Sequence, residues 1–340
     1  MQCRTVKATK INTVEFVKEA FEESIQSPTE VILKNRFSHI SAGTELACLA
    51  GLESWFEIPG VPGYTAIGEI IEKGEAVDQF NVGDGVYTMG PHQEYYKIDI
   101  TDRWHGLCVP VPDGLDEDVA AFTHMAGIAM TSLRASSIEL GDTVLVTGLG
   151  VIGNLAAQLA QLQGARVIAV DLVDHRLDVA KACGIQQVYN SKKEDIPALI
   201  NKLTDAAGVN AFIDATGVSP VIEQYAGTVA FNGELILLGS PRQPYQTDLT
   251  QVLQKVHLLP HSLTMKGALE FTFPTQNDEF VKHSIERNSR IIMELMRRDE
   301  LKIKPFYTHK LHPSEAQNAY DGLANDKDTY MGVVFDWLNL

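Results

Sequence analysis

Three glycines and one aspartate have the residue types and the spacing that bind a dinucleotide. Gly148, Gly150 and Gly153 form a G-x-G-x-x-G triplet directly after an apolar run, and Asp171 ends the next apolar run. In this pattern the first glycine allows a tight turn and the second lets the backbone approach a pyrophosphate. The third lets the following helix pack close to the sheet. Strand, triplet, helix, strand and acid occur in register, so we expect a nicotinamide cofactor.

Neighbouring residues predict how the cofactor is held. The helix beginning at Val151 and Ile152 offers free N–H groups and a positive dipole end to the phosphates. Asp171 would accept hydrogen bonds from both adenine-ribose hydroxyls and repel a 2′-phosphate, which favours NAD over NADP. We expect further contacts on the adenine ribose from Arg176, although arginine there is often only surface charge. Contacts to the nicotinamide half are expected at the ends of two later strands, from Thr216, Gly217, Gly239 and Ser240.

The elements that position these residues follow from the apolar pattern. Strands are expected at 143–147, 166–171, 187–189, 211–215, 234–238 and 263–268, with helices between them. This alternation predicts an α/β fold with a doubly wound parallel sheet. The first hundred residues consist of short β-branched runs separated by Pro-Gly turns, which is typical of a small barrel or sandwich. A long helix is expected at 278–298, and a closing strand at 331–337.

Length and charge limit the classes of protein to consider. With 340 residues the chain is expected to form two domains, residues 1–116 with 275–340 and residues 117–274. The net charge of −16 argues against a nucleic acid or an anionic membrane surface as partner. No secretory signal or membrane-length apolar run is visible, which predicts a cytoplasmic protein. Four widely spaced cysteines are expected to be isolated thiols: Cys3, Cys48, Cys108 and Cys183.

Several local motifs give the chain a family resemblance. They lie at Pro59–Glu69, Val82–Val86, Gly141–Val146, Asp214–Gly217 and Met265–Gly267. In these motifs and in their order the chain resembles the medium-chain dehydrogenase/reductase superfamily, the zinc alcohol dehydrogenase-like proteins. The resemblance implies a GroES-like catalytic β-barrel built from both chain ends, a Rossmann domain that binds NAD, and a cofactor lying between the two. It also implies a homodimer or homotetramer, with the strand near 263–269 at the interface.

The departures from the family pattern concern the metal. Where zinc members carry C-G-T-D, this chain has Ala42 in place of the cysteine, and Tyr64 replaces the histidine of G-H-E. Alanine has no donor atom, and a neutral phenol is a poor zinc ligand. The four-cysteine lobe of the family is also missing between Pro91 and Val111. We therefore expect no metal. The variants resemble bacteriochlorophyllide hydroxyethyl dehydrogenases and bacterial sugar or glycoside dehydrogenases.

Three residues at family positions are candidates for moving the substrate proton without zinc. Thr44 matches a position that relays the proton, although it could equally cap a helix. Tyr64 could hydrogen-bond the substrate oxygen or act as base, or it could simply be a wall residue. His124 has the side chain best suited to accept a proton, because an unperturbed imidazole has a pKa of about 6.5. It could instead be a structural histidine.

Three further residues are expected to line the substrate site: His39, Glu45 and His92. Structural roles for the two histidines remain open, since histidines are common on loops. A remodelled metal site from His124, His39 and Glu45 is chemically allowed, because zinc accepts nitrogen and oxygen ligands. Their spacing matches no known pattern.

The residues and the resemblance together predict a zinc-independent, NAD-dependent alcohol dehydrogenase or ketone reductase. The expected substrate is a polyhydroxylated alcohol or ketone, oxidised or reduced at a secondary hydroxyl of a sugar, glycoside or polyol. One alternative is a quinone or enoyl reductase of the same fold, although Asp171 disfavours the NADP that those relatives usually use. Another alternative is a non-catalytic NAD-binding regulatory protein.

Overall fold

The chain folds into two units, which a computed structural model describes over all of residues 1–340. The first unit comprises Met1–His124 together with Phe273–Leu340, and the second comprises Met125–Thr272. The sequence placed the two divisions at residues 116 and 274. None of the helices is both long enough and apolar enough to cross a membrane.

The second unit is built on a six-stranded sheet. Its strands are β8 (Thr143–Thr147), β9 (Arg166–Asp171), β10 (Gln187–Asn190), β11 (Val209–Asp214), β12 (Val229–Leu237) and β13 (Thr264–Gly267). Every pairing is parallel, and the order is β10-β9-β8-β11-β12-β13. The predicted doubly wound sheet is confirmed. Because the strand order reverses between β8 and β11, the loops that follow these strands diverge and leave room for a ligand.

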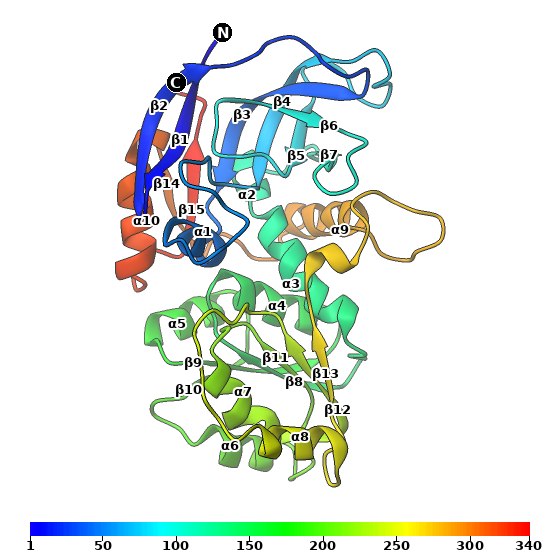
Figure 1. Cartoon of the computed structure of the whole chain (residues 1–340). Coiled ribbons are helices and arrows are strands. Elements are labelled where there is room, and N and C mark those ends of the chain that lie inside the picture. The colour runs from blue at the N-terminus through cyan, green and yellow to red at the C-terminus, as the bar shows by residue number, and fades with distance from the viewer. The chain divides into compact units, whose positions relative to one another are not determined.

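Helices cover both faces of this sheet. They are α3 (Thr123–Ala135), α4 (Val151–Leu162), α5 (Asp174–Ala182), α6 (Ile196–Leu203), α7 (Ser219–Tyr225) and α8 (Leu249–His257), with short 3-10 turns η1 (Ala226–Thr228) and η2 (Glu270–Thr272). Figure 1 shows α4 and α5 on one side of the sheet and α6, α7 and α8 on the other. A buried apolar cluster that includes Ile200, Phe212 and Tyr225 joins the sheet to the second group. Burial of this cluster stabilises the layered arrangement.

The first unit contains a mixed sheet and a separate two-stranded ribbon. Its strands are β1 (Gln2–Lys10), β2 (Thr13–Ala20), β3 (Glu30–His39), β4 (Ala66–Lys73), β5 (Gly85–Thr88), β6 (Tyr95–Asp99), β7 (Cys108–Pro110), β14 (Tyr307–Leu311) and β15 (Gly332–Asp336). The main sheet runs β14-β15-β3-β4-β5-β7, and β6 pairs with β3. Strands from both ends of the chain thus form one sheet. This is the GroES-like unit that accompanies the Rossmann unit.

The helices of the first unit are few. They are α1 (Ala42–Leu49), α2 (Glu117–Ala120), α9 (Ile285–Arg297) and α10 (Ala316–Asn325), with the 3-10 turn η3 (Pro313–Glu315). The predicted helix at 278–298 was wrong at its start, because Ser284 is the N-cap. Its Oγ accepts the N–H of Arg287 at 3.0 Å. A serine that satisfies a free N–H fixes the beginning of a helix more strongly than upstream apolar residues do.

Strand β3 changes partners along its length, and its end carries Ser38 and His39. Its first half pairs with β6, and its end pairs with β15, where Ser38 lies opposite Phe335 and His39 opposite Val334. Register shifts in its pairing with β4 bend the strand. The end of β3 and the start of α1 therefore lie beside the last strand of the chain.

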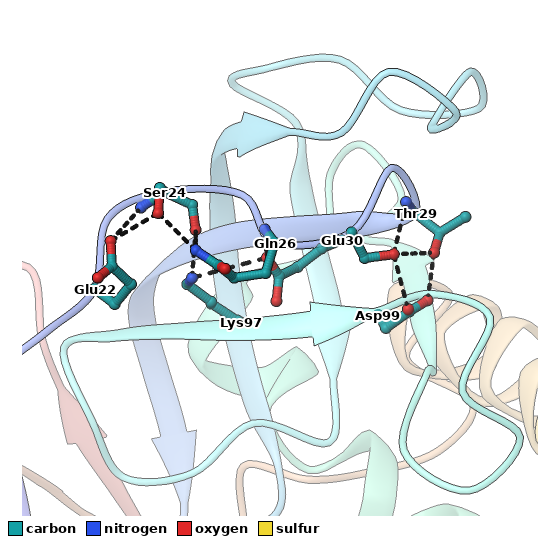
Figure 2. A network of polar contacts seen from close by, with 8 residues as sticks. Glu22, Ser24, Gln26, Thr29, Glu30, Lys97 and Asp99 are labelled. Atoms are coloured by element: carbon teal, nitrogen blue, oxygen red, sulfur yellow. Dashed lines mark hydrogen bonds and ion pairs between the residues drawn. The ribbon is translucent and has the colours of Figure 1, made fainter.

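A partly exposed polar cluster, here called the rim network, ties the connection between β2 and β3 to β6 (Figure 2). It consists of Glu22, Ser24, Gln26, Thr29, Glu30, Lys97 and Asp99. Lys97 donates to the carbonyl oxygen of Ser24 at 2.5 Å, and Thr29 Oγ1 donates to Asp99 at 2.8 Å. The network holds a loop that has little apolar surface of its own.

Candidate functional site

The glycine triplet makes a turn in which Gly148 and Gly153 leave no room for a side chain. Gly148 has φ +82°, in the left-handed region, and a Cβ there would lie 2.8 Å from the methyl carbon of Thr216. A Cβ on Gly153 would lie 1.7 Å from the carbonyl oxygen of Gly148, so α4 packs directly on the turn. Both glycines are needed for the reasons expected from the sequence.

Two later loops meet beside this turn. Gly217 has φ +63°, and a Cβ there would lie 2.4 Å from the carbonyl oxygen of Ser240. A Cβ on Gly239 would lie 2.2 Å from the backbone nitrogen of Gly217. Buried Asp214 anchors the first loop by accepting the hydroxyl of Thr216 at 2.6 Å and the N–H of Gly217 at 3.2 Å. The structure thus brings the predicted nicotinamide-side residues together with the triplet.

Asp171 is buried behind the turn and holds it. Its carboxylate accepts the N–H of Leu149 at 2.6 Å, that of Leu172 at 2.7 Å and that of Val173 at 2.9 Å. Arg176 lies 3.7 Å from the same carboxylate. A carboxylate has about four lone-pair sites, and three N–H groups occupy three of them here, so Asp171 retains about one site for a ribose hydroxyl.

The residues present fit a dinucleotide. A Cβ on Gly150 would meet nothing within 4 Å, so open space borders the backbone where a pyrophosphate would lie. Gly150 is the N-cap of α4, which has no side-chain cap hydrogen bond, so the first N–H groups, at Val151 and Ile152, have no capping side chain. An uncapped helix N-terminus favours an anion.

Two of the candidate acid–base residues lie side by side in the first unit. The phenol of Tyr64 donates to Ser41 Oγ, and the imidazole of His124 meets the Tyr64 ring edge-on, with the ring centroids 5.0 Å apart. Tyr64 is half-buried, whereas His124 is buried. The pair therefore combines a phenol on a half-buried residue with a buried imidazole.

Thr44 lies within α1 and is half-buried. The helix begins at Ala42 with Ser41 as N-cap, so Thr44 does not cap it. The capping alternative for Thr44 was wrong, because the helix begins earlier than the Gly-Thr-Glu sequence suggests. Its role as a proton relay stays a prediction.

Glu45 and His92 belong to a buried network that joins α1, β3 and α10 to the loops beside them. One carboxylate oxygen of Glu45 accepts the N–H of Ser41 at 2.7 Å. The other contacts His92 Nε2 at 3.0 Å and accepts the hydroxyl of Tyr320 at 2.5 Å. On the other side of the imidazole, Nδ1 lies 2.8 Å from Ser38 Oγ.

The network ends at Trp337, whose indole N–H donates to Ser38 Oγ at 2.8 Å. We call this set the buried network; its members are Ser38, Ser41, Glu45, His92, Tyr320 and Trp337. Burial, with the Glu45 charge as second cause, raises the pKa of Tyr320 well above its usual range, so the phenol remains a donor. Glu45 and His92, predicted to touch substrate, contact each other, and their direct contact with a substrate stays a prediction.

His39 lies at the end of β3 and is 1% exposed. Neither ring nitrogen has a hydrogen-bond partner, and the ring packs on Phe122 with the centroids 4.3 Å apart. Burial, and then the charges that His92 and His124 would carry, lower the pKa of His39 to about 3. An imidazole with that pKa is a poor proton acceptor near neutrality, so His39 does not suit the role of base.

All four cysteines are free and buried, as expected. No group of three or more His, Cys, Asp or Glu side chains is arranged to hold a metal ion. The alternative site from His124, His39 and Glu45 is not assembled, because Glu45 is turned onto His92 and Tyr320.

Sequence reasoning missed Ser38, Tyr320 and Trp337. Tyr320 and Trp337 lie far from α1 along the chain, and Ser38 is one residue near the end of strand β3, where its neighbours give no sign of a polar network. The one available signal was the acid four residues after Ser41, which reaches back to the start of its own helix.

Comparisons with known proteins agree with this architecture. Residues 151–283 match the family model described as zinc-binding dehydrogenase. Sorbitol dehydrogenase of Halalkalibacterium halodurans is 30% identical over 243 residues, covering 62% of this chain and 70% of the relative. D-guloside 3-dehydrogenase of Escherichia coli K12 is 32% identical over 174 residues, covering 51% of this chain and 49% of the relative.

Two solved structures share the fold. A proposed zinc-binding dehydrogenase from Sinorhizobium meliloti 1021, bound to NADP, has a TM-score of 0.81 at 19% identity and covers 99% of each chain. A short chain alcohol dehydrogenase from Escherichia coli CFT073, complexed with NADH, has a TM-score of 0.81 at 16% identity. It covers 98% of this chain and 99% of its own.

The chain belongs to the zinc-binding dehydrogenase family of the medium-chain dehydrogenase/reductase superfamily. Its relatives are oxidoreductases that act on alcohols, and a nicotinamide cofactor fits both the relatives and the triplet.

Proposed function

We propose that this protein is an NAD-dependent alcohol dehydrogenase or ketone reductase that works without zinc. Its substrate would be a sugar, glycoside or polyol, oxidised at a secondary hydroxyl. The observation that carries the proposal is the placement of Tyr64, a half-buried residue. Its hydroxyl donates to Ser41, and its ring packs against the ring of His124. Relatives named for sorbitol and for a guloside support the substrate class.

The proposed chemistry needs a hydride acceptor and a proton acceptor. When bound, the nicotinamide accepts the hydride from the alcohol carbon. The hydroxyl proton must leave at the same time, and a positioned side chain must take it because no Lewis acid lowers its pKa. Tyr64 would hydrogen-bond the substrate oxygen, and His124 or Tyr64 would take the proton, with Thr44 as relay. Ala42 supports the absence of zinc, since it supplies no ligand atom.

The test is a screen for NAD⁺ reduction with sorbitol, galactitol and methyl glucosides, with zinc content measured on the same sample. A quinone with NADPH serves as the competing arm. We expect turnover of at least one polyol or glycoside without stoichiometric zinc. Tyr64→Phe and His124→Ala should each lower kcat by about 100-fold, the size of a general acid–base contribution. Lys97→Gln in the rim network is the control.

Other results would overturn the assignment. Stoichiometric zinc needed for turnover would remove the metal-free mechanism. Unchanged turnover in both Tyr64→Phe and His124→Ala would remove the acid–base residues. Reduction of the quinone alone would make the protein a quinone reductase, and tight NADH binding with no turnover of any kind would make it a regulatory protein.

The proposed preference for NAD rests on Asp171, because its carboxylate would repel a 2′-phosphate. Arg176 is already drawn toward that carboxylate, at 3.7 Å, and is less available to a phosphate. Titration with NADH and NADPH, followed by nicotinamide fluorescence, should give a Kd ratio of more than about tenfold, or 1.4 kcal/mol. Asp171→Ser should reduce that ratio, and equal affinities in the wild type would contradict it.

We also propose a homodimer or homotetramer in the cytoplasm. Strand β13 is one of the two edges of the six-stranded sheet and is largely exposed, as are Met265 and Leu269 on and beside it. An unpaired edge with apolar side chains favours pairing with a second copy. Light scattering after gel filtration would test this, and a monomer at micromolar concentration would contradict it.

A further inference from the structure

The side chain of Glu45 accepts the backbone N–H of the residue that caps its own helix, α1. Glu45 is the fourth residue of the helix, and its carboxylate reaches back to the N–H of Ser41, the N-cap. In a capping box the serine hydroxyl would accept a helix N–H in return. Here Ser41 makes no side-chain cap and accepts the phenol of Tyr64 instead. Glu45 therefore fixes the residue that orients Tyr64.

His92 contacts the turn that directly precedes Tyr64. Its backbone N–H donates to the carbonyl oxygen of Pro62 at 2.9 Å. Gly63, directly before Tyr64, has φ +97°, and a Cβ there would lie 2.7 Å from the His92 ring. The turn that presents Tyr64 is thus built against the His92 ring.

The residues of the buried network that can only donate or only accept determine which atom donates in its other hydrogen bonds. Trp337 can only donate, so Ser38 Oγ accepts from it. A carboxylate can only accept, so Nε2 of His92 donates to Glu45, and in the neutral imidazole Nδ1 then accepts the Ser38 hydroxyl. Glu45 accepts hydrogen bonds from three donors, Ser41, His92 and Tyr320, and a fully hydrogen-bonded buried carboxylate is held in one orientation.

We propose that Glu45 and His92 are positioning residues for the Tyr64 hydroxyl. Glu45 acts through Ser41, and His92 acts through the Pro62–Gly63 turn and through Glu45. Neither residue needs to touch the substrate. The inference rests on the proposed function only for its catalytic consequence, because the placement of the phenol can be measured without a substrate.

The first measurement uses full-length protein with a fluorotyrosine at position 64 and follows its fluorine NMR line. The wild type should give one sharp line, since Ser41 and the turn allow one ring position. Glu45→Gln and His92→Gln should broaden or split that line, and the control Lys97→Gln should leave it unchanged. A sharp, unshifted line in both buried-network variants would overturn the proposal. Two variants are used because either one alone could fail to fold.

The second measurement is a double-mutant cycle on NAD⁺ reduction, with sorbitol as the probe substrate. Glu45→Gln should lower kcat by about 10-fold or more with KM changed by less than about threefold. In the Tyr64→Phe background the same change should lower kcat by less than about twofold, because the group it positions is gone. His92→Gln should retain more activity than His92→Ala, since an amide can still donate to Glu45.

These outcomes separate the two proposals. Equal, independent losses from Glu45→Gln with and without Tyr64 would overturn the positioning role while leaving Tyr64 catalytic. A Tyr64→Phe enzyme of full activity would overturn the proposed catalytic role of Tyr64, and the fluorine line would still decide whether Glu45 and His92 position its side chain.

Discussion

The buried network and the rim network use the same kinds of group in opposite surroundings. Each has a carboxylate at its centre, a nitrogen cation or imidazole beside it and hydroxyls around it. In the buried network Glu45 and His92 are almost wholly inaccessible, whereas Glu22 and Ser24 of the rim network are exposed (Figure 2). Water can replace any rim contact that is lost. It cannot do so around Glu45.

This difference predicts unequal consequences for equal changes. A surface ion pair contributes about 0–1 kcal/mol, because solvent screens it and ordering the side chains costs entropy. A buried group left without its partner costs more, because its desolvation is no longer compensated. Four substitutions or conditions test the contrast, and the expected effects decrease from the first to the last.

The largest effect is expected from His92→Phe. Phenylalanine keeps the ring, but it removes the donor to Glu45 and the acceptor for Ser38. Breaking a buried charged contact in this way should lower the free energy of unfolding by about 3–5 kcal/mol. Denaturant unfolding at neutral pH measures the change. A loss below about 1 kcal/mol would mean that water reaches Glu45 and that the contrast with the rim is false.

The second effect is a dependence on pH that comes from His39. Its pKa is about 3 in the folded chain, and its ordinary value is 6.5, so between these values the unfolded chain binds more protons. The contribution of His39 to the free energy of unfolding is fully present above about pH 6.5. It decreases as the pH falls, by about 2 kcal/mol at pH 5. His39→Phe should remove this part of the decline.

The rim offers the matched comparison for that measurement. Hydrogen bonds from Thr101 lower the pKa of Asp99, so its contribution is present above its ordinary value of 3.8 and is lost only below it. Asp99→Asn should therefore leave the decline between pH 6.5 and pH 4.5 unchanged. Parallel curves for wild type and His39→Phe across that interval would show that His39 is not kept neutral by burial.

The same contrast explains what the sequence could predict. The parallel sheet, the triplet and the positions of Asp171, Thr216 and Gly239 follow from local patterns, because each pattern needs only its own strand, turn or helix. The buried network could not be predicted in this way, because its members meet only through tertiary contacts. Glu45 meets Tyr320 across 275 positions, and Ser38 meets Trp337 across 299, so no local spacing announces them. The start of α9 was misplaced because the cap, not the apolar run, decides it.

The third effect, from Ser38→Ala, is expected to be moderate. The change leaves the indole N–H of Trp337 and Nδ1 of His92 without a partner, while Glu45 keeps all its donors. An unsatisfied buried neutral group costs about 1–3 kcal/mol, so we expect a loss in the lower half of that range. Ser24→Ala in the rim network is the control and should be close to neutral. Equal losses from the two serines would contradict the importance of burial.

The smallest effect is expected from Lys97→Gln, the rim counterpart of His92→Phe. Lys97 donates to the carbonyl oxygen of Ser24 and lies 3.8 Å from Glu30, but glutamine can still donate and water can solvate Glu30. The loss should be below about 1 kcal/mol and should shrink further in high salt, because charges that keep contact with solvent are screened more than fully buried ones. The loss from His92→Phe should hardly change with salt. A salt-independent loss as large as that of His92→Phe would place Lys97 in a low-dielectric setting and make the two networks one kind of structure.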